Sequence, residues 1–309
     1  MDLELSDDQM ALRDGIRSLL EGRFQPDRVR LGFDREMFSE LEGAGVLSLV
    51  DDGFSWADAA VVFEELGRFV VPGPIVDTLV ARTAGVGRDG VVGVVEALGS
   101  EPAVVEHLDH LDALLVLLGD GGSLVAAAGL DGDPSPWPLD PLTPVTSVAA
   151  LPAGERVLDS GAVDAVRAQG AVLTAAFCVG MSDRLTSLSV EYAKQREQFD
   201  RPIGSFQTVK HILADMLVRT EVARAAVYAA AANLDDPGAG DLARSVATAK
   251  VVAGEAAIAN GKAATQVHGG MGYVWEVDVH LYLKRAWVLD THFGSADAHA
   301  DALGASLTA

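Results

Sequence analysis

The sequence predicts a mainly α-helical protein in which helical regions flank a short, β-rich middle. Apolar residues recur at helical spacing towards both ends of the chain. The middle instead has short Val, Ala and Leu runs separated by Gly and Pro. Hydrophobic residues make up 49% of the 309 residues, enough for a sizeable core. We expect three parts: an N-terminal helical domain over residues 1–70, a reduced β-rich domain over 71–160 and a four-helix bundle over 161–309.

The N-terminal part carries signals for three helices. Ser6 is followed by Asp7, Asp8 and Gln9, a pattern typical of an N-cap with an acidic first turn. A second helix is expected over Glu36–Ala44, with Gly45 as its stop. A third begins at Ser55, whose hydroxyl could cap it, and ends near Gly67.

The middle part is predicted from three apolar runs, VVGVV, ALLVLL and SLVAAAG. They are interpreted as strands of a small sheet, although runs of this length do not by themselves separate strand from helix. The segment DGDPSPWPLDPLTP is a loop by composition.

The last part is predicted to contain four long helices. They are expected over Val163–Gln195, Ser205–Asn233 and Leu242–Gln266, with the last beginning near Asp278. Antiparallel helices joined by short connections form a four-helix bundle.

Charge and cysteine content exclude some functions. The formal net charge is −22, which argues against nucleic acid and against an anionic membrane surface as partners. The apolar runs, such as LDALLVLLG, are too short to predict a membrane span. The single cysteine, Cys178, fits a reducing compartment and a buried, inert thiol. With an acidic N-terminus, these features favour a cytoplasmic protein, and no metal site is expected.

Two segments carry the residues suited to binding chemistry. In Tyr192–Met216, Arg196 and Phe199 are three apart near a corner between helices, so they are expected to face the same side of a helix end. The guanidinium suits a phosphate and the ring offers a stacking face, although the residues alone favour a surface Arg with a core Phe that holds the corner. In Gln266–Ala286, glycines after Gln266 would let backbone approach a ligand closely. Their spacing does not match G-x-G-x-x-G, so a Rossmann fold is not supported.

Together these segments resemble the acyl-CoA dehydrogenase family. The first carries R-x-x-F, P-I, F-Q and L-A-D-M, and the second carries Q-x-x-G-G-x-G-Y. In this chain the matching residues are Tyr192-Ala193, Arg196, Phe199, Pro202-Ile203, Phe206-Gln207, Leu213–Met216 and Gln266–Tyr273. The N-terminal Leu5-Ser6 and the run Glu64–Arg68 are also similar to the family.

The resemblance implies N-terminal helices, a middle β-domain and a C-terminal four-helix bundle, with FAD as cofactor. It also implies α,β-dehydrogenation of an acyl-CoA thioester, in which a carboxylate base removes the α-proton and the β-hydrogen leaves as hydride. Electron-transfer flavoprotein is the expected acceptor. By resemblance, one set of residues contacts the FAD of a neighbouring subunit: Arg196, Phe199, Gln266, Val267, His268, Gly269 and Gly270.

The sequence departs from the family pattern at the positions of the catalytic base. Phe293 stands where the family often has a Glu after its last helix, and Gly170 stands at the second place where some members put the base. Neither side chain can accept a proton, so no catalytic residue is predicted in this chain. The middle part also lacks the family's T-E-P…G-S-D type segment, which holds the flavin ring of the same subunit.

Three hypotheses remain open. The chain is similar to the short subunits of heteromeric α2β2 actinobacterial acyl-CoA dehydrogenases that act on steroid side-chain thioesters, in which a second subunit supplies the base. Alternatively, it is a self-sufficient homomeric dehydrogenase with an atypical base, for which His292 and Asp297 are candidates. The third hypothesis is a helical scaffold without cofactor or catalysis.

Overall fold

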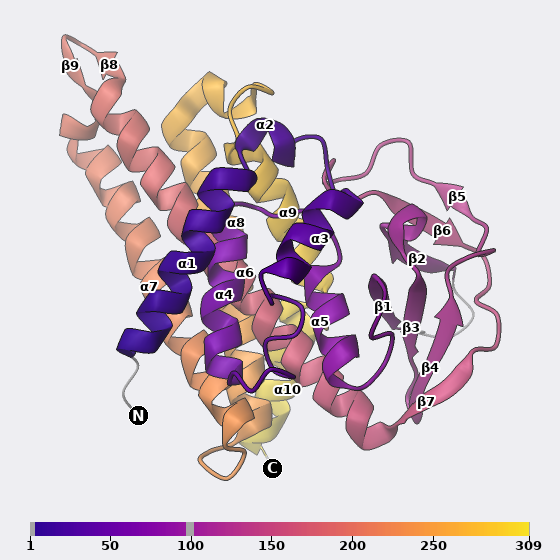
Figure 1. Cartoon of the computed structure of the whole chain (residues 1–309). Helices are drawn as coiled ribbons and strands as arrows, with labels where there is room; N and C mark the ends of the chain where they lie inside the picture. The colour runs from indigo at the N-terminus through magenta and orange to yellow at the C-terminus, as the bar shows by residue number, and fades with distance from the viewer. Residues whose placement is uncertain (1–3, 97–101, 309) are drawn as a thin grey trace. The chain divides into compact units, whose positions relative to one another are not determined.

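The computed structural model describes residues 4–96 and 102–308, which form two compact units (Figure 1). Unit 1 comprises Met1–Asp27, Trp56–Val71 and Ala171–Ala309. Unit 2 comprises Arg28–Ser55 and Pro72–Gly170. The units are therefore built from interleaved segments, and the division into three consecutive domains stays a prediction.

Unit 1 is helical, as expected. Its helices are α1 (Asp7–Arg23), α4 (Trp56–Arg68), the larger part of α6 (Ser160–Gln195), α7 (Gln207–Asp235), α8 (Leu242–His268), α9 (Val279–Thr291) and α10 (Ala296–Thr308). Helix α8 packs against α7, α9 and α10, while α4 packs against α1 and α7. The predicted mainly helical fold with a C-terminal bundle is confirmed, and α10 extends the bundle by one helix.

Two helix starts in unit 1 show different kinds of capping. The Ser6 hydroxyl accepts a hydrogen bond from the Gln9 amide, and the Gln9 side chain accepts one from the Ser6 amide. This capping box confirms the predicted start of α1. Helix α4 is capped by a residue that is far away in the sequence. The amides of Trp56 and Ala57 donate to the two carboxylate oxygens of Asp235, at 2.7 and 3.0 Å.

Helices α4 and α6 touch through their backbones. A Cβ atom at Gly180 of α6 would overlap the carbonyl oxygen of Glu64 in α4. A Cβ atom at Gly67 of α4 would likewise overlap the carbonyl oxygen of Phe177 in α6. Only glycine permits so close an approach, so these two residues set the distance between the helices.

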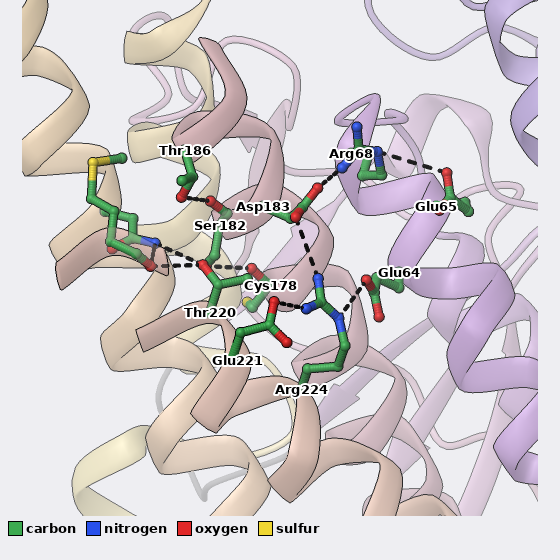
Figure 2. A network of polar contacts seen from close by, with 12 residues as sticks. Glu64, Glu65, Arg68, Cys178, Ser182, Asp183, Thr186, Thr220, Glu221 and Arg224 are labelled. Carbon is green, nitrogen blue, oxygen red and sulfur yellow. Dashed lines mark hydrogen bonds and ion pairs between the residues drawn. The ribbon is translucent and has the colours of Figure 1, made fainter. Parts of the chain in front are cut away.

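A network of charged side chains, of which only Glu64 and Glu65 are fully buried, surrounds this contact (Figure 2). Arg224 of α7 donates to Glu64 at 3.0 Å and forms ion pairs with Asp183 and Glu221. Arg68 of α4 pairs with Asp183 of α6. The network extends to α1, where Arg17 donates to both oxygens of the buried Glu65. Four helices are thus joined by mutually paired charges.

Unit 2 combines two small sheets with short helices. The four-stranded sheet has the order β1-β3-β4-β7, in which β1 and β3 are parallel and the other pairs antiparallel. The three-stranded antiparallel sheet has the order β2-β6-β5. The strands are β1 (Val92–Glu96), β2 (Ala103–Glu106), β3 (Ala113–Leu117), β4 (Gly121–Ala126), β5 (Asp133–Pro134), β6 (Val145–Val148) and β7 (Glu155–Asp159). The three apolar runs therefore do form strands, as predicted.

The helices of unit 2 are α3 (Arg35–Gly43), α5 (Ile75–Thr83) and the 3₁₀ turn η1 (Leu108–His110), while the short α2 (Pro26–Val29) spans the boundary between the units in the sequence. Helix α3 matches the predicted second helix, with Asp34 as its N-cap. Helix α5 was not predicted. It packs on β1, where the Thr78 hydroxyl hydrogen-bonds the Val92 backbone and Asp77 accepts from the Val94 amide.

Helix α6 is longer than the apolar runs that were judged too short to span a membrane. By length and composition it could cross a bilayer, since one 18-residue window has a mean hydropathy of 1.3. However, 67% of that window is buried inside the protein, as in the core helix of a globular domain. Cys178 lies within α6 and is buried as predicted, and burial raises the pKa of its thiol to about 12.

The contact between α4 and α6 makes a prediction about stability. We expect Gly180→Ala to lower the free energy of unfolding by about 1–3 kcal/mol or more, because the added methyl forces the two backbones apart. Gly15→Ala is the matched control, since Gly15 is exposed in α1 and a Cβ placed there would meet nothing within 4 Å. That change should stabilise the protein by up to about 1 kcal/mol. Urea unfolding measures the free energy of unfolding of both variants. Equal changes in Gly180→Ala and Gly15→Ala would contradict the backbone contact.

Candidate functional site

The first motif forms a β-hairpin between α6 and α7. Strand β8 (Glu197–Gln198) pairs with β9 (Arg201–Pro202), and the 3₁₀ turn η2 (Ile203–Ser205) leads into α7 (Figure 1). The sequence interpretation placed Arg196 and Phe199 on one side of a helix end. That placement is wrong, because α6 ends at Gln195 and Phe199 lies at the hairpin turn.

Phe199 adopts a conformation that its residue type rarely takes. Its φ is 55° and that of Asp200 is 59°, so both turn residues are left-handed. Asp tolerates this region and replaces the glycine expected there, but a bulky aromatic residue is unusual in it. The Phe199 side chain is also 86% exposed, which rules out the interpretation of Phe199 as a core residue. An exposed, strained aromatic at a hairpin tip is typical of a functional position.

The second motif ends α8. The helix continues two residues beyond Gln266 to His268, and Gly269 follows with φ 59° and ψ −137°. Only glycine readily adopts this conformation. The 3₁₀ turn η3 (Gly269–Tyr273) comes next. Nothing lies within 4 Å of a Cβ placed at Gly269 or Gly270, so bare backbone faces open space at this turn.

The structure brings the two motifs together at the ends of α6 and α8. The rings of Tyr192 and His268 stack with their centroids 4.3 Å apart, and the Tyr192 hydroxyl donates to the His268 carbonyl at 3.4 Å. The His268 Nδ1 atom lies 2.8 Å from the carbonyl oxygen of Ala264. Burial lowers the pKa of His268, which favours the neutral ring in this stack.

The predicted cofactor residues differ in their access to a ligand. Arg196, Phe199, Gln266, Gly269 and Gly270 are exposed. The side chains of Arg196 and Gln266 make no hydrogen bond or ion pair with any other described residue. Val267 and His268 are buried, at 8% and 7% exposure, so their side chains pack within the fold, and their role as cofactor contacts stays a prediction.

The position of the family's base holds a buried phenyl ring. Phe293 lies in the turn between α9 and α10, has a φ of 52° and is 8% exposed. Gly170, the second position considered, is buried within α6. Neither place offers a proton acceptor.

The turn around Phe293 is held by a lysine and a histidine. Lys250 of α8 is buried, and its Nζ donates to the carbonyls of Leu289 and Asp290 at 2.9 Å, which caps the C-terminal end of α9. Burial lowers the pKa of Lys250. On the other side, His299 Nε2 lies 3.0 Å from the Phe293 carbonyl oxygen, and burial lowers the pKa of that ring. The sequence alone did not indicate Lys250.

The buried carboxylates of α4 are also unsuited to act as a base. One oxygen of Glu64 accepts from Arg224, and the other accepts from the Tyr228 hydroxyl at 2.8 Å. Both oxygens of Glu65 accept from Arg17. Burial is the largest influence raising the pKa of Tyr228, and the neighbouring Glu64 adds to it, so Tyr228 stays a hydrogen-bond donor.

These groups define a binding surface rather than a catalytic centre. Arg196 offers a planar cation for phosphate oxygens, and Phe199 offers an aromatic face for a ring. Gln266 and the open backbone at Gly269 and Gly270 offer hydrogen bonds and close approach. These exposed groups are of the kinds that bind phosphates and rings.

Comparisons with known proteins identify the family of this chain. Residues 165–308 match the family model described as acyl-CoA dehydrogenase, C-terminal domain. Acyl-CoA dehydrogenase IpdE2 from Mycolicibacterium smegmatis is 34% identical over 305 residues, which covers 91% of this chain and 93% of that protein. IpdE2 from Mycobacterium tuberculosis is also 34% identical and covers 91% of each chain. The chain belongs to the acyl-CoA dehydrogenase family.

Solved structures support the same fold. One chain of the ChsE4-ChsE5 complex from Mycobacterium tuberculosis superposes with a TM-score of 0.84 at 24% identity, covering 100% of this chain and 99% of that one. Butyryl-CoA dehydrogenase from Megasphaera elsdenii gives a TM-score of 0.81 at 19% identity and covers 100% of both chains.

The glycines after α8 give a test of the turn geometry. We expect Gly269→Ala to destabilise the chain by roughly 1–3 kcal/mol, because alanine is strained at this φ and ψ. Gly270→Ala is the neighbouring control and should change stability by less than about 0.5 kcal/mol, since its Cβ meets nothing. Thermal and urea unfolding compare the two, and equal stabilities would argue against the backbone conformation at Gly269.

Proposed function

We propose that this chain is the partner subunit of a heteromeric, FAD-dependent acyl-CoA dehydrogenase. It contributes cofactor contacts across the interface but not the catalytic base. The observation that carries the proposal is the contrast between two regions of unit 1. Arg196, Phe199 and Gln266 are exposed and available, whereas a buried Phe293 occupies the position of the family's base.

The reaction is the α,β-dehydrogenation of an acyl-CoA thioester. Bound FAD supplies the acceptor for the β-hydrogen as hydride. The residues of this chain would bind and orient the cofactor: Arg196 would pair with phosphate oxygens, Phe199 would offer its ring for stacking and Gln266 would hydrogen-bond a polar oxygen. The second subunit supplies the carboxylate that removes the α-proton. Electron-transfer flavoprotein is the proposed acceptor of the electrons, and the complex is proposed to be cytoplasmic.

The assembly and substrate are inferred from the relatives. The ChsE4-ChsE5 complex and the Tcur3481-Tcur3483 steroid ACAD each combine two different polypeptides. An α2β2 heterotetramer acting on a steroid side-chain thioester is therefore the arrangement that we propose for this chain. Relatives of the same fold have been solved with FAD and with FADH2, which supports FAD as the cofactor.

The cofactor contact is tested in the complex with a second acyl-CoA dehydrogenase subunit that carries the catalytic Glu and co-purifies with this chain. We expect Arg196→Ala to weaken FAD binding by about 10- to 100-fold, because a charge-assisted hydrogen bond contributes roughly 1.5–3 kcal/mol. Lys194→Ala is the matched control, since Lys194 is an exposed cation two residues away. The flavin absorbance per assembled complex, measured on dilution, reports the loss. Unchanged FAD content in Arg196→Ala would favour the scaffold hypothesis.

The absence of a base in this chain is tested by substituting the remaining candidates. We expect His292→Ala and Asp297→Asn to leave kcat of the complex, and its pH profile, nearly unchanged. If one of these residues were the general base, its substitution would instead lower kcat by about 10²- to 10⁴-fold. Such a loss, or stoichiometric FAD binding and dye reduction by the isolated chain, would show a self-sufficient dehydrogenase and overturn the proposal.

A further inference from the structure

The hairpin between α6 and α7 carries a second arginine besides Arg196. Arg201 is exposed in β9, and its side chain forms no hydrogen bond or ion pair with any other described residue. Its guanidinium carbon instead lies over the Phe206 ring, 4.1 Å from the ring centre. An arginine held over an aromatic face in this way keeps its N–H donors free for another group.

The register of the hairpin places Arg196 and Arg201 on the same face. Gln198 pairs with Arg201, and the Ile203 amide donates to the Arg196 carbonyl at 2.7 Å, which extends the ladder by one pair. Side chains alternate between the two faces of a strand, so Arg196 and Gln198 share a face, with Arg201 opposite Gln198. Arg196 and Arg201 are therefore diagonal neighbours. Such neighbours lie about 7–8 Å apart, within reach of long side chains.

The turn of the hairpin fixes this register. A two-residue turn of type I′ needs a positive φ at both central residues, and Phe199 and Asp200 have φ values of 55° and 59°. The turn geometry is therefore kept although an Asp stands in place of the expected Gly. A slip by one residue would move Arg201 to the opposite face of the hairpin.

The acidic residues of the hairpin do not neutralise the two arginines. Glu197 pairs with Pro202 and so lies on the opposite face from Arg201. Asp200 is in the turn. In the described part of the chain, neither carboxylate forms an ion pair with Arg196 or Arg201. Two cations without an acidic partner thus share one face in a protein whose net charge is −22, and such a face favours an anion.

We propose that Arg201 is a second anion-binding residue that, together with Arg196, holds the diphosphate group of FAD. A diphosphate carries a negative charge on each phosphate, and each guanidinium can donate two parallel N–H groups to one of them. The inference rests on the proposed function, in which this hairpin contacts FAD, and it assigns the diphosphate to a pair of arginines rather than to Arg196 alone. Phe206 is then a positioning residue, because its ring orients Arg201 before the cofactor binds.

The test uses the complex of this chain with the second subunit that carries the catalytic Glu. We expect Arg201→Gln to weaken FAD binding about tenfold, measured from the flavin released on dilution, because a charge-assisted hydrogen bond to phosphate is lost. Arg201→Lys should recover part of the affinity, since lysine keeps the charge but not the planar fork. Lys194→Gln removes an exposed cation of α6 and is the matched control, which should bind FAD normally.

Salt dependence separates a direct contact from a purely structural role. Ions screen exposed charges, so the FAD affinity of the unmodified complex should fall as the NaCl concentration rises. We expect a less steep fall in Arg201→Gln and the unmodified slope in Lys194→Gln. If the slope in Arg201→Gln equals that of the unmodified complex, Arg201 only shapes the hairpin, and the proposal is overturned even where FAD affinity has decreased.

The outcomes also distinguish this proposal from the function on which it rests. If Arg196→Ala loses FAD and Arg201→Gln retains it, the second anion-binding residue is wrong and the proposed function stands. If both variants retain FAD, the cofactor contact of this chain is wrong as well. Acyl-CoA also contains a diphosphate. A higher KM for acyl-CoA in Arg201→Gln without loss of FAD would therefore assign Arg201 to the substrate and overturn the assignment to FAD.

Discussion

The rest of unit 1 depends on the backbone contact between α4 and α6. Because Gly67 and Gly180 carry no side chain, the helices approach until each glycine meets a backbone carbonyl of the opposite helix. This closeness lets Arg68 of α4 reach Asp183 of α6, and α7 joins through Arg224 (Figure 2). Glu64, another partner of Arg224, is buried, so removing Arg224 would leave an uncompensated buried charge, and the network helps to hold α4, α6 and α7 together. The hairpin with Phe199 connects those two helices.

Local sequence signals were enough to predict much of the fold. The capping box at Ser6, the strands from Val-rich runs and the long C-terminal helices all depend on residues close together in the sequence. Contacts between distant residues were not predictable in this way. Asp235 caps α4 from the far end of α7, and Lys250 caps α9. Helix α5 was missed because its short apolar run fits helix and strand equally well.

The candidate site was predicted in part. Family resemblance located its residues, but residue type alone left open whether Phe199 belonged to the core. In the structure, the Phe199 side chain is exposed and its backbone is left-handed, so Phe199 is not a core residue. Neither property follows from the letters R-x-x-F. Sequence also could not show that Val267 and His268 point into the fold, because helix α8 continues past Gln266 and turns those side chains inward.

The capped end of α9 has a consequence for how this chain can evolve. Phe293 sits in a tight, left-handed turn whose carbonyls and neighbours engage Lys250 and His299. A glutamate returned to this position would have to bury its charge in a space shaped for a phenyl ring, at a considerable desolvation cost. Placing a base here would therefore require several coordinated changes rather than one. Under the proposed function, the reliance on a companion polypeptide would then resist reversal by single mutations.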